Sequence, residues 1–317
     1  MTRTADDFLV EIGRKPDDDA LKAVFADWLL ERGDPRGELM ALQLKSHRTD
    51  EDLSREALLL KANVRSWLPD EVLINLVPSS IVFEKGVFAA ARVSVRSQSA
   101  LTASLSHPAW GTVRRLSGAP LELIERCPVI EELTELDEAT ITGLAQRGRG
   151  IGRLSTIGVV VRSPGELARA FESPSVESVR ELRLGFPDVD ETRQQPLGLS
   201  DLGWLFRTAL CGRLQRLVLQ TGWLDLATLL NGLELLETRV PELQLTPMTF
   251  EPTSWWVRFS HQRRRVIVHP GSELNASFSE GPVRELLATA PNDWFEGASL
   301  PEGWASVRRL PCFRRVR

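Results

Sequence analysis

The sequence predicts an α/β fold, specifically an irregular leucine-rich-repeat-like solenoid capped by an N-terminal helical module. Three observations predict it: a dense helix-turn-helix pattern early in the chain, a recurring apolar-x-x-Leu-x-Leu pattern further on, and helical stretches between the copies of that pattern. The helical module is placed at residues 1–75. The solenoid, with a C-terminal cap, is placed at residues 76–317.

The first element is an amphipathic helix that follows the aspartates at 17–19 and ends at Arg32. Its apolar residues recur at helical spacing along one face and are Leu21, Val24, Phe25, Trp28 and Leu29. The aspartates provide an N-cap and a negative first turn. Gly33 provides the residue with positive φ that commonly ends a helix.

A turn of two or three residues connects this helix to a second one, which Asp34 caps and Pro35 begins. We expect an ion pair between Asp27 and Arg36 to fix this corner. The structural corner comprises Asp27, Trp28, Gly33, Asp34, Pro35 and Arg36. A third helix over residues 53–67 completes the module.

The string DDDALKAVFADWLLERGDPRGELMALQ at residues 17–43 resembles the repeat-companion domain, a short bacterial module with an ADWL-ERGDPRGE-LQ core. The similarity is weaker at Trp67-Leu68 and at residues 83–95, where FEKGVFAAARVSV is similar to the family's glycine-containing hairpin. Phe25 and Leu30 depart from the common tyrosine and glutamate. The resemblance covers about a third of the chain and implies architecture, a module in front of leucine-rich-repeat-like arrays, without established chemistry.

A hairpin is predicted over residues 81–95, turning at Lys85-Gly86. An array of repeats leaves apolar surface and unpaired strand edges at its ends. The hairpin and the helical module would therefore cover the open N-terminal edge.

The solenoid is predicted from full and partial copies of the repeat pattern. The full copies are Val179-Leu182-Leu184, Leu214-Leu217-Leu219 and Val240-Leu243-Leu245, and the partial copies start at Val113-Leu116, Ile130-Leu133 and Ile151-Leu154. Successive central leucines are 17, 21, 28, 35 and 26 residues apart, whereas leucine-rich repeats run about 20–29 residues. Helices are predicted between them, at residues 99–106, 121–126, 138–146, 164–172, 199–210, 223–230 and 282–290.

A non-solenoid α/β sandwich is the alternative fold. The asparagine of regular repeats is replaced by Pro187, Gly222 and Met248 in the three full copies. Some other group must then satisfy the backbone of those turns.

The predicted function is the binding of another protein by a strand-lined face. Alternate residues of each strand point away from the core, and the exposed set is Glu181, Arg183, Arg216, Val218, Glu242 and Gln244. Trp255 and Trp256, in the aromatic and basic segment 253–268, extend the partner-binding set, because tryptophan and arginine often dominate interface energetics. The alternative role for these tryptophans is to close the C-terminal end of the core.

The sequence predicts no catalytic, metal or cofactor site. It carries no GxSxG, HExxH or Walker-type motif. Of its four histidines (His47, His107, His261 and His269), His261 and His269 lie eight residues apart, which is no helical metal spacing, and a hydrolase that uses this pair is the remaining alternative. The three cysteines are widely separated, so no disulfide framework is expected. The sequence therefore favours a non-enzymatic scaffold.

The alternative function is a nucleic-acid-associated regulator. Residues 255–317 hold 10 arginines against 6 acidic residues, whereas residues 1–60 hold 9 basic against 14 acidic residues. The C-terminal arginines could contact phosphates; they include Arg258, Arg263, Arg264, Arg265, Arg308, Arg309, Arg314, Arg315 and Arg317. The net charge of −4 disfavours this reading.

No membrane partner is expected. The longest apolar runs fall far short of the roughly 20 residues that cross a bilayer. The acidic opening residues do not resemble a secretory signal. The expected location is cytoplasmic.

Overall fold

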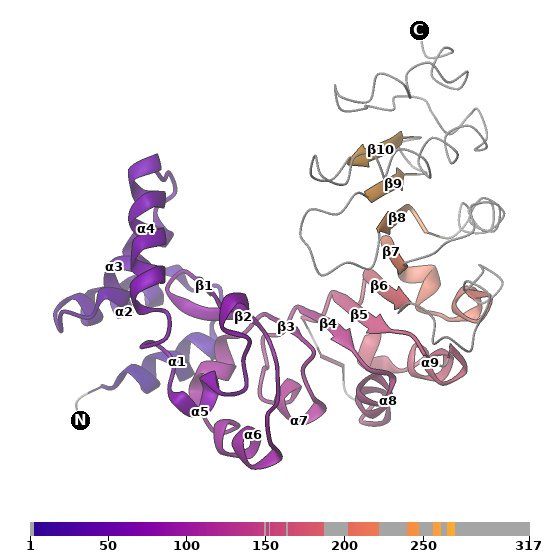
Figure 1. Ribbon diagram of the computed structural model, residues 1–317, viewed down its shortest axis with the longest axis horizontal. Coiled ribbons are helices and arrows are strands. Elements are labelled where there is room, and N and C mark those ends of the chain that lie inside the picture. Colours follow the sequence, from indigo (N-terminus) through magenta and orange to yellow (C-terminus); the bar gives the residue numbers. More distant parts are fainter. Residues whose placement is uncertain are drawn as a thin grey trace, which may run out of the picture. The chain divides into compact units, whose positions relative to one another are not determined.

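A computed structural model of the chain describes residues 3–148, 150–151, 153–162, 164–186, 202–221, 240–246, 256–260 and 265–269 (Figure 1). The chain divides into two compact units. The N-terminal unit comprises Met1–Leu136 and Ile151–Leu154, and the C-terminal unit comprises Asp137–Gly150 and Ser155–Arg317. Both units are α/β and their strands pair mostly in parallel, which confirms the predicted class. The boundary at residue 75 stays a prediction.

The N-terminal unit begins with helices whose first turns are mostly capped by side chains. They are α1 (Ala5–Arg14), α2 (Asp19–Leu30), α3 (Pro35–Leu44), α4 (Asp50–Asn63) and the short α5 (Asp70–Leu73). Thr4, Asp18, Asp34 and Thr49 accept hydrogen bonds from the first turns of α1 to α4. The two helices predicted around Gly33 are confirmed. The third begins earlier than predicted because Thr49 forms a capping box, and α1 was not evident from the sequence pattern.

The buried face of α2 is rotated relative to the predicted face. Lys22 is buried beside Phe25 and Leu29, whereas Val24 is 54% exposed. Burial of Lys22 is tolerated because its Nζ donates a hydrogen bond of 2.7 Å to the backbone oxygen of Pro16. The prediction that Val24 lies on the core face is therefore wrong.

The predicted hairpin is confirmed. Strands β1 (Val82–Glu84) and β2 (Val87–Arg92) pair antiparallel. The turn residues Lys85 and Gly86 have φ of 49° and 70°. Positive φ at both central residues is the requirement of a tight type I′ turn.

The other strands of the N-terminal unit are parallel. β2 pairs with β3 (Arg115–Ser117), and β3 pairs with β4 (Glu132–Leu136). The connections contain α6 (Gln98–Ser104), the 3-10 helix Pro108–Thr112 and α7 (Leu121–Ile124). Within this unit α6 and α7 lie on the same side of the strands (Figure 1). Leu116 and Leu133 are in register and buried, as predicted.

The C-terminal unit continues the alternation of helices and strands. Its elements include α8 (Glu138–Gln146), β5 (Thr156–Val160), α9 (Pro164–Ala170), β6 (Glu181–Phe186), β7 (Arg216–Thr221), β8 (Glu242–Thr246), β9 (Trp256–Ser260) and β10 (Arg265–His269). Strands β5 to β8 pair in parallel, and β8, β9 and β10 pair antiparallel. Antiparallel strands thus follow the parallel set.

A row of apolar residues crosses the parallel strands of this unit in register. Ile157, Leu182, Leu217 and Leu243 pair in sequence, and all are buried. Leu154, predicted as a central leucine, precedes β5 by two residues, so that assignment is wrong by three positions. The corrected spacings are 182 − 157 = 25, 217 − 182 = 35 and 243 − 217 = 26 residues.

Most other predicted helices can be compared with the structure. The ranges 121–126, 138–146 and 164–172 contain α7, α8 and α9, and α6 begins one residue before the predicted range 99–106. The described part of 199–210 contains the 3-10 helix Leu205–Arg207 in place of a longer helix. Residues 223–230 and 282–290, with Pro187, Gly222 and Met248, lie outside the described residues.

Candidate functional site

The predicted partner-binding residues of the C-terminal unit fall into two rows across strands β6, β7 and β8. Glu181 pairs with Arg216, which pairs with Glu242. The second row is Arg183, Val218 and Gln244. The strand alternation inferred from the sequence is therefore confirmed, and the apolar row lies between these two.

The charged members of these rows are joined in a chain of ion pairs. Arg183 Nε lies 2.7 Å from Glu181 Oε1, and the other oxygen of Glu181 lies 3.2 Å from Arg216. Arg216 also lies 3.1 Å from a carboxylate oxygen of Glu242. All four side chains are half-buried. The face therefore presents charges that are already paired with one another.

Val218 was predicted to be exposed, and this is wrong. Only 5% of its surface is accessible. It lies between Arg183 and Gln244 in its row. Its short β-branched side chain does not reach past these longer neighbours, so they leave it little contact with solvent.

A groove with a volume of about 480 Å³ runs across the starts of strands β5 to β8. We name it the strand-start groove. Each strand contributes its first residue and the residue before it: Ser155, Thr156, Arg180, Glu181, Gln215, Arg216, Pro241 and Glu242. Three predicted residues, Glu181, Arg216 and Glu242, line it. Equivalent positions in successive copies of the apolar-x-x-Leu-x-Leu sequence pattern are the signal that could locate it.

Backbone hydrogen bonds hold the strand starts together. The carbonyl oxygen of Ser155 accepts from the amides of Arg180 (2.8 Å) and Glu181 (3.0 Å). The carbonyl oxygen of Arg180 accepts in the same way from Gln215 (2.7 Å) and Arg216 (3.1 Å). The groove-lining positions are therefore fixed by the main chain rather than by loops.

The aromatic and basic segment is only partly described. Trp256 is the first residue of β9 and pairs with His269 of β10. Arg258 pairs with Gln244 of β8. The strand predicted around residues 265–268 is confirmed as β10. Trp255 and the arginines at 263, 264 and 308–317 lie outside the described residues.

The corner of the N-terminal unit is built largely as predicted. The Asp34 carboxylate accepts a 2.9 Å hydrogen bond from the amide of Arg36, and Pro35 is the first residue of α3. Gly33 has φ of 67°. The Trp28 ring is covered by the guanidinium of Arg32, whose carbon lies 3.8 Å from the ring centroid.

The predicted ion pair between Asp27 and Arg36 is wrong. Arg36 is buried, and its Nε donates a 2.7 Å hydrogen bond to the carbonyl oxygen of Gly86 in the β1–β2 turn. Its guanidinium carbon lies 5.6 Å from the ring centroids of both Phe25 and Phe83. Burial lowers the pKa of Arg36 to about 10, so the group is still charged at neutral pH.

Gln43 forms the second contact between α3 and the hairpin turn. Its Oε1 accepts a 2.7 Å hydrogen bond from the amide of Gly86, and its Nε2 donates to the backbone oxygen of Phe83 at 3.1 Å. Arg36, Met40 and Gln43 follow helical spacing and share one face of α3. This face of α3 therefore holds the hairpin turn against the helix.

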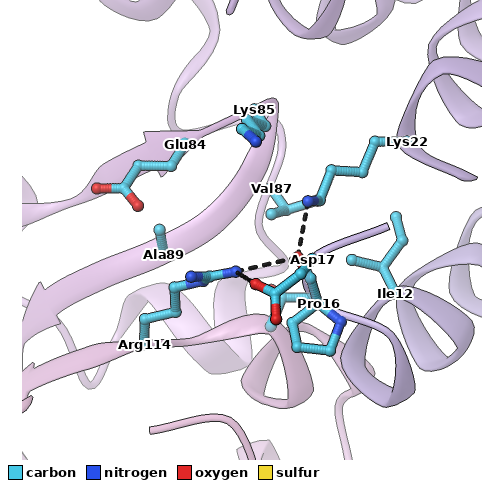
Figure 2. Close-up of a pocket in the computed structure, with 10 residues that line it drawn as sticks. Ile12, Pro16, Asp17, Lys22, Glu84, Lys85, Val87, Ala89 and Arg114 are labelled. Carbon is cyan, nitrogen blue, oxygen red and sulfur yellow. Dashed lines mark hydrogen bonds and ion pairs between the residues drawn. The ribbon is translucent and has the colours of Figure 1, made fainter. Parts of the chain in front are cut away.

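A smaller cavity of about 160 Å³ lies in the N-terminal unit beside the segment that precedes α2 (Figure 2). Lys22 and Arg114 converge there on the backbone oxygen of Pro16. The Asp17 carboxylate lies 2.9 Å from Arg114 and 2.8 Å from Arg153. Hydrogen bonds from these two arginines lower the pKa of Asp17 to about 2.

We predict that Asp17 contributes to acid sensitivity of the N-terminal unit. Its folded-state pKa is depressed, so its stabilising effect is present above the unfolded pKa near 4 and is lost as pH falls towards about 2. Thermal melts of Asp17→Asn between pH 5 and pH 2 should depend less on pH than those of the wild type. Arg153→Gln should also reduce the dependence of the melting temperature on pH. An unchanged dependence in Asp17→Asn would contradict the prediction.

Reactive groups are not grouped into a recognisable catalytic site in the described residues. There, no cluster of three or more histidine, cysteine or acidic residues could hold a metal ion. Burial raises the pKa of the Cys127 thiol, which disfavours the reactive thiolate. The Nδ1 of His107 accepts a hydrogen bond from the amide of Ala109, where it caps a 3-10 helix.

Within the described residues, no helix is both long and apolar enough to cross a membrane. Comparison with family models, with curated proteins and with solved structures finds no match to this chain.

Proposed function

We propose that the chain is a non-catalytic scaffold or adaptor that binds another protein through the strand face of its C-terminal unit. In this proposal the strands and their connections form a leucine-rich-repeat-like solenoid. The helical module caps it, as the resemblance to the repeat-companion domain implies, and the protein acts in the cytoplasm.

The observation that carries the proposal is the strand-start groove. Four neighbouring strands contribute residues at the same two positions, and the main chain beneath them is hydrogen-bonded from strand to strand. Repeat architectures typically bind partners on such extended surfaces. Since the positions are fixed before binding, little conformational entropy is lost when a partner docks.

The ion-paired chain supports protein binding rather than catalysis. Arg183, Glu181, Arg216 and Glu242 alternate in sign, and each charge has an opposite neighbour. Charges arranged in this way favour a complementary partner and disfavour others. The residues that line the groove include no histidine, cysteine or lysine.

Photo-crosslinking in native host cells tests the proposal. A benzophenone side chain placed at Gln215, an exposed residue of the groove, should capture a specific protein that mass spectrometry identifies. The control position is Arg169, which is exposed on α9. It should capture much less of that protein.

Equal capture at both positions, or no protein captured from Gln215, would contradict the proposal. Nucleic acid recovered in place of protein would favour the alternative, a regulator that uses the arginine-rich C-terminal region. Binding of that kind weakens with added salt with a slope that is set by the number of phosphates contacted.

A further inference from the structure

One charged group of the strand-start groove stands outside the chain of ion pairs. The charged residues that line the groove are Arg180, Glu181, Arg216 and Glu242. Arg216 pairs with both glutamates. The remaining group is Arg180.

Arg180 is exposed at the groove and has no carboxylate partner among the described residues. Its NH1 group donates to the backbone oxygens of Glu177 and Val179, each at 2.9 Å. These contacts hold one side of the guanidinium in place. They use one of its three nitrogens, and a guanidinium carries five N–H donors in a planar fork that suits a carboxylate.

Gln215 is the residue equivalent to Arg180 on the next strand. It is exposed and lines the same groove. The backbone amide of Gln215 donates a 2.7 Å hydrogen bond to the backbone carbonyl oxygen of Arg180, so the two backbones lie side by side. A carboxylate of the partner bound at Arg180 would therefore lie one strand away from the Gln215 side chain. That side chain is polar and uncharged, so it would not repel the carboxylate.

The size of the groove limits its occupant. Neighbouring strands are about 4.8 Å apart, so the groove crosses about 14 Å from β5 to β8. An extended chain rises about 3.3 Å per residue. About five residues of an extended segment would span the four strands.

We infer that the strand-start groove binds an extended segment of another protein that carries one acidic residue, with its glutamate or aspartate carboxylate at Arg180. This inference rests on the proposed function and specifies the chemistry of the partner. Arg180 supplies the attraction, and the ion-paired Glu181 and Glu242 disfavour a second acidic side chain near them. A single acidic residue flanked by small neutral ones suits this pattern.

Fluorescence anisotropy with labelled hexapeptides tests the inference on the full chain. The probes are serine peptides that carry one central glutamate, glutamine or lysine. The glutamate peptide should bind more tightly than the other two, and its affinity should fall with added salt because the contact is exposed. Arg180→Gln should weaken its binding about tenfold, the effect of losing one charge-assisted hydrogen bond.

Arg169→Gln is the matched control, since Arg169 is exposed on α9 and does not line the groove. It should leave the affinity unchanged. Arg180→Glu should reverse the preference towards the lysine peptide, a gain that a misfolded variant could not produce. Both variants should keep the wild-type circular dichroism spectrum.

Equal binding of the glutamate and glutamine peptides, no binding of any peptide, or full affinity in Arg180→Gln would overturn the inference. Those outcomes would leave the proposed function standing if the crosslinker at Gln215 still captured a protein. Failure of the crosslinking experiment alone would instead refute the scaffold role. A failure of the inference can therefore be distinguished from a failure of the proposed function.

Discussion

Replacing Gly86 by alanine is expected to lower the free energy of unfolding of the N-terminal unit by about 2–5 kcal/mol, which combines left-handed strain with overpacking. A Cβ atom at this position would lie 1.7 Å from Cγ and 2.8 Å from Cβ of Met40. Met40 is fully buried, so its side chain has no free space to move into. Urea denaturation followed by circular dichroism measures the loss.

Gly33→Ala is the matched control for this experiment. Gly33 has a similar φ of 67°, but a Cβ atom there would meet nothing within 4 Å. It should cost only the strain of the left-handed conformation, about 1–2 kcal/mol. If both variants lost the same stability, the contact between α3 and the hairpin turn would be refuted as the cause.

Replacing Arg36 by alanine is expected to cost about 2–4 kcal/mol, because it leaves the buried Gly86 carbonyl without a donor and empties the space between two aromatic rings. Arg36→Met should cost less, because it keeps most of the packing volume and loses only the donor. Thermal and urea melts of the two variants separate the contribution of packing from that of the hydrogen bond.

Arg32 provides the comparison for Arg36. Both arginines lie against aromatic rings, but the Arg32 side chain is 43% exposed, and it donates to the backbone oxygen of Trp28 within its own helix turn. Exposed contacts of this kind contribute about 0.5–1 kcal/mol. A loss in Arg36→Ala no greater than in Arg32→Ala would show that the bond to the hairpin contributes little.

Local features of the fold could be predicted from the sequence because they depend on neighbouring residues. Asp34 and Pro35 determine where α3 begins, and Lys85-Gly86 determines where the hairpin turns. The leucines at 182, 217 and 243 were assigned to one row, and they pair in register. In each case the signal lies within a few residues of the element that it specifies.

Features that depend on distant residues were missed. Arg36 binds Gly86, which is 50 positions away, and no local spacing indicates that partner. Lys22 can be buried because its Nζ donates a hydrogen bond to the backbone oxygen of Pro16, a partner that the polarity of lysine does not reveal in the sequence. Leu154 was placed in a strand because β5 carries Ile157 where its neighbours carry leucine.

The candidate site was predicted only in part, because it too depends on contacts between residues that are distant in the sequence. Strand alternation located Glu181, Arg216 and Glu242, but it could not reveal that they pair with one another. Arg180 was missed because it precedes its strand. Its role depends on a groove that exists only after four strands have come together.

The strand starts stay in register although the intervals between them are 25, 35 and 26 residues. Ten additional residues between β6 and β7 are therefore accommodated without displacing the first residue of either strand. Insertions and deletions can accumulate in the connections while the order of side chains along the groove is preserved. At the ion-paired positions, a change at one strand start would also remove the partner of the next, so such changes are expected to be coupled.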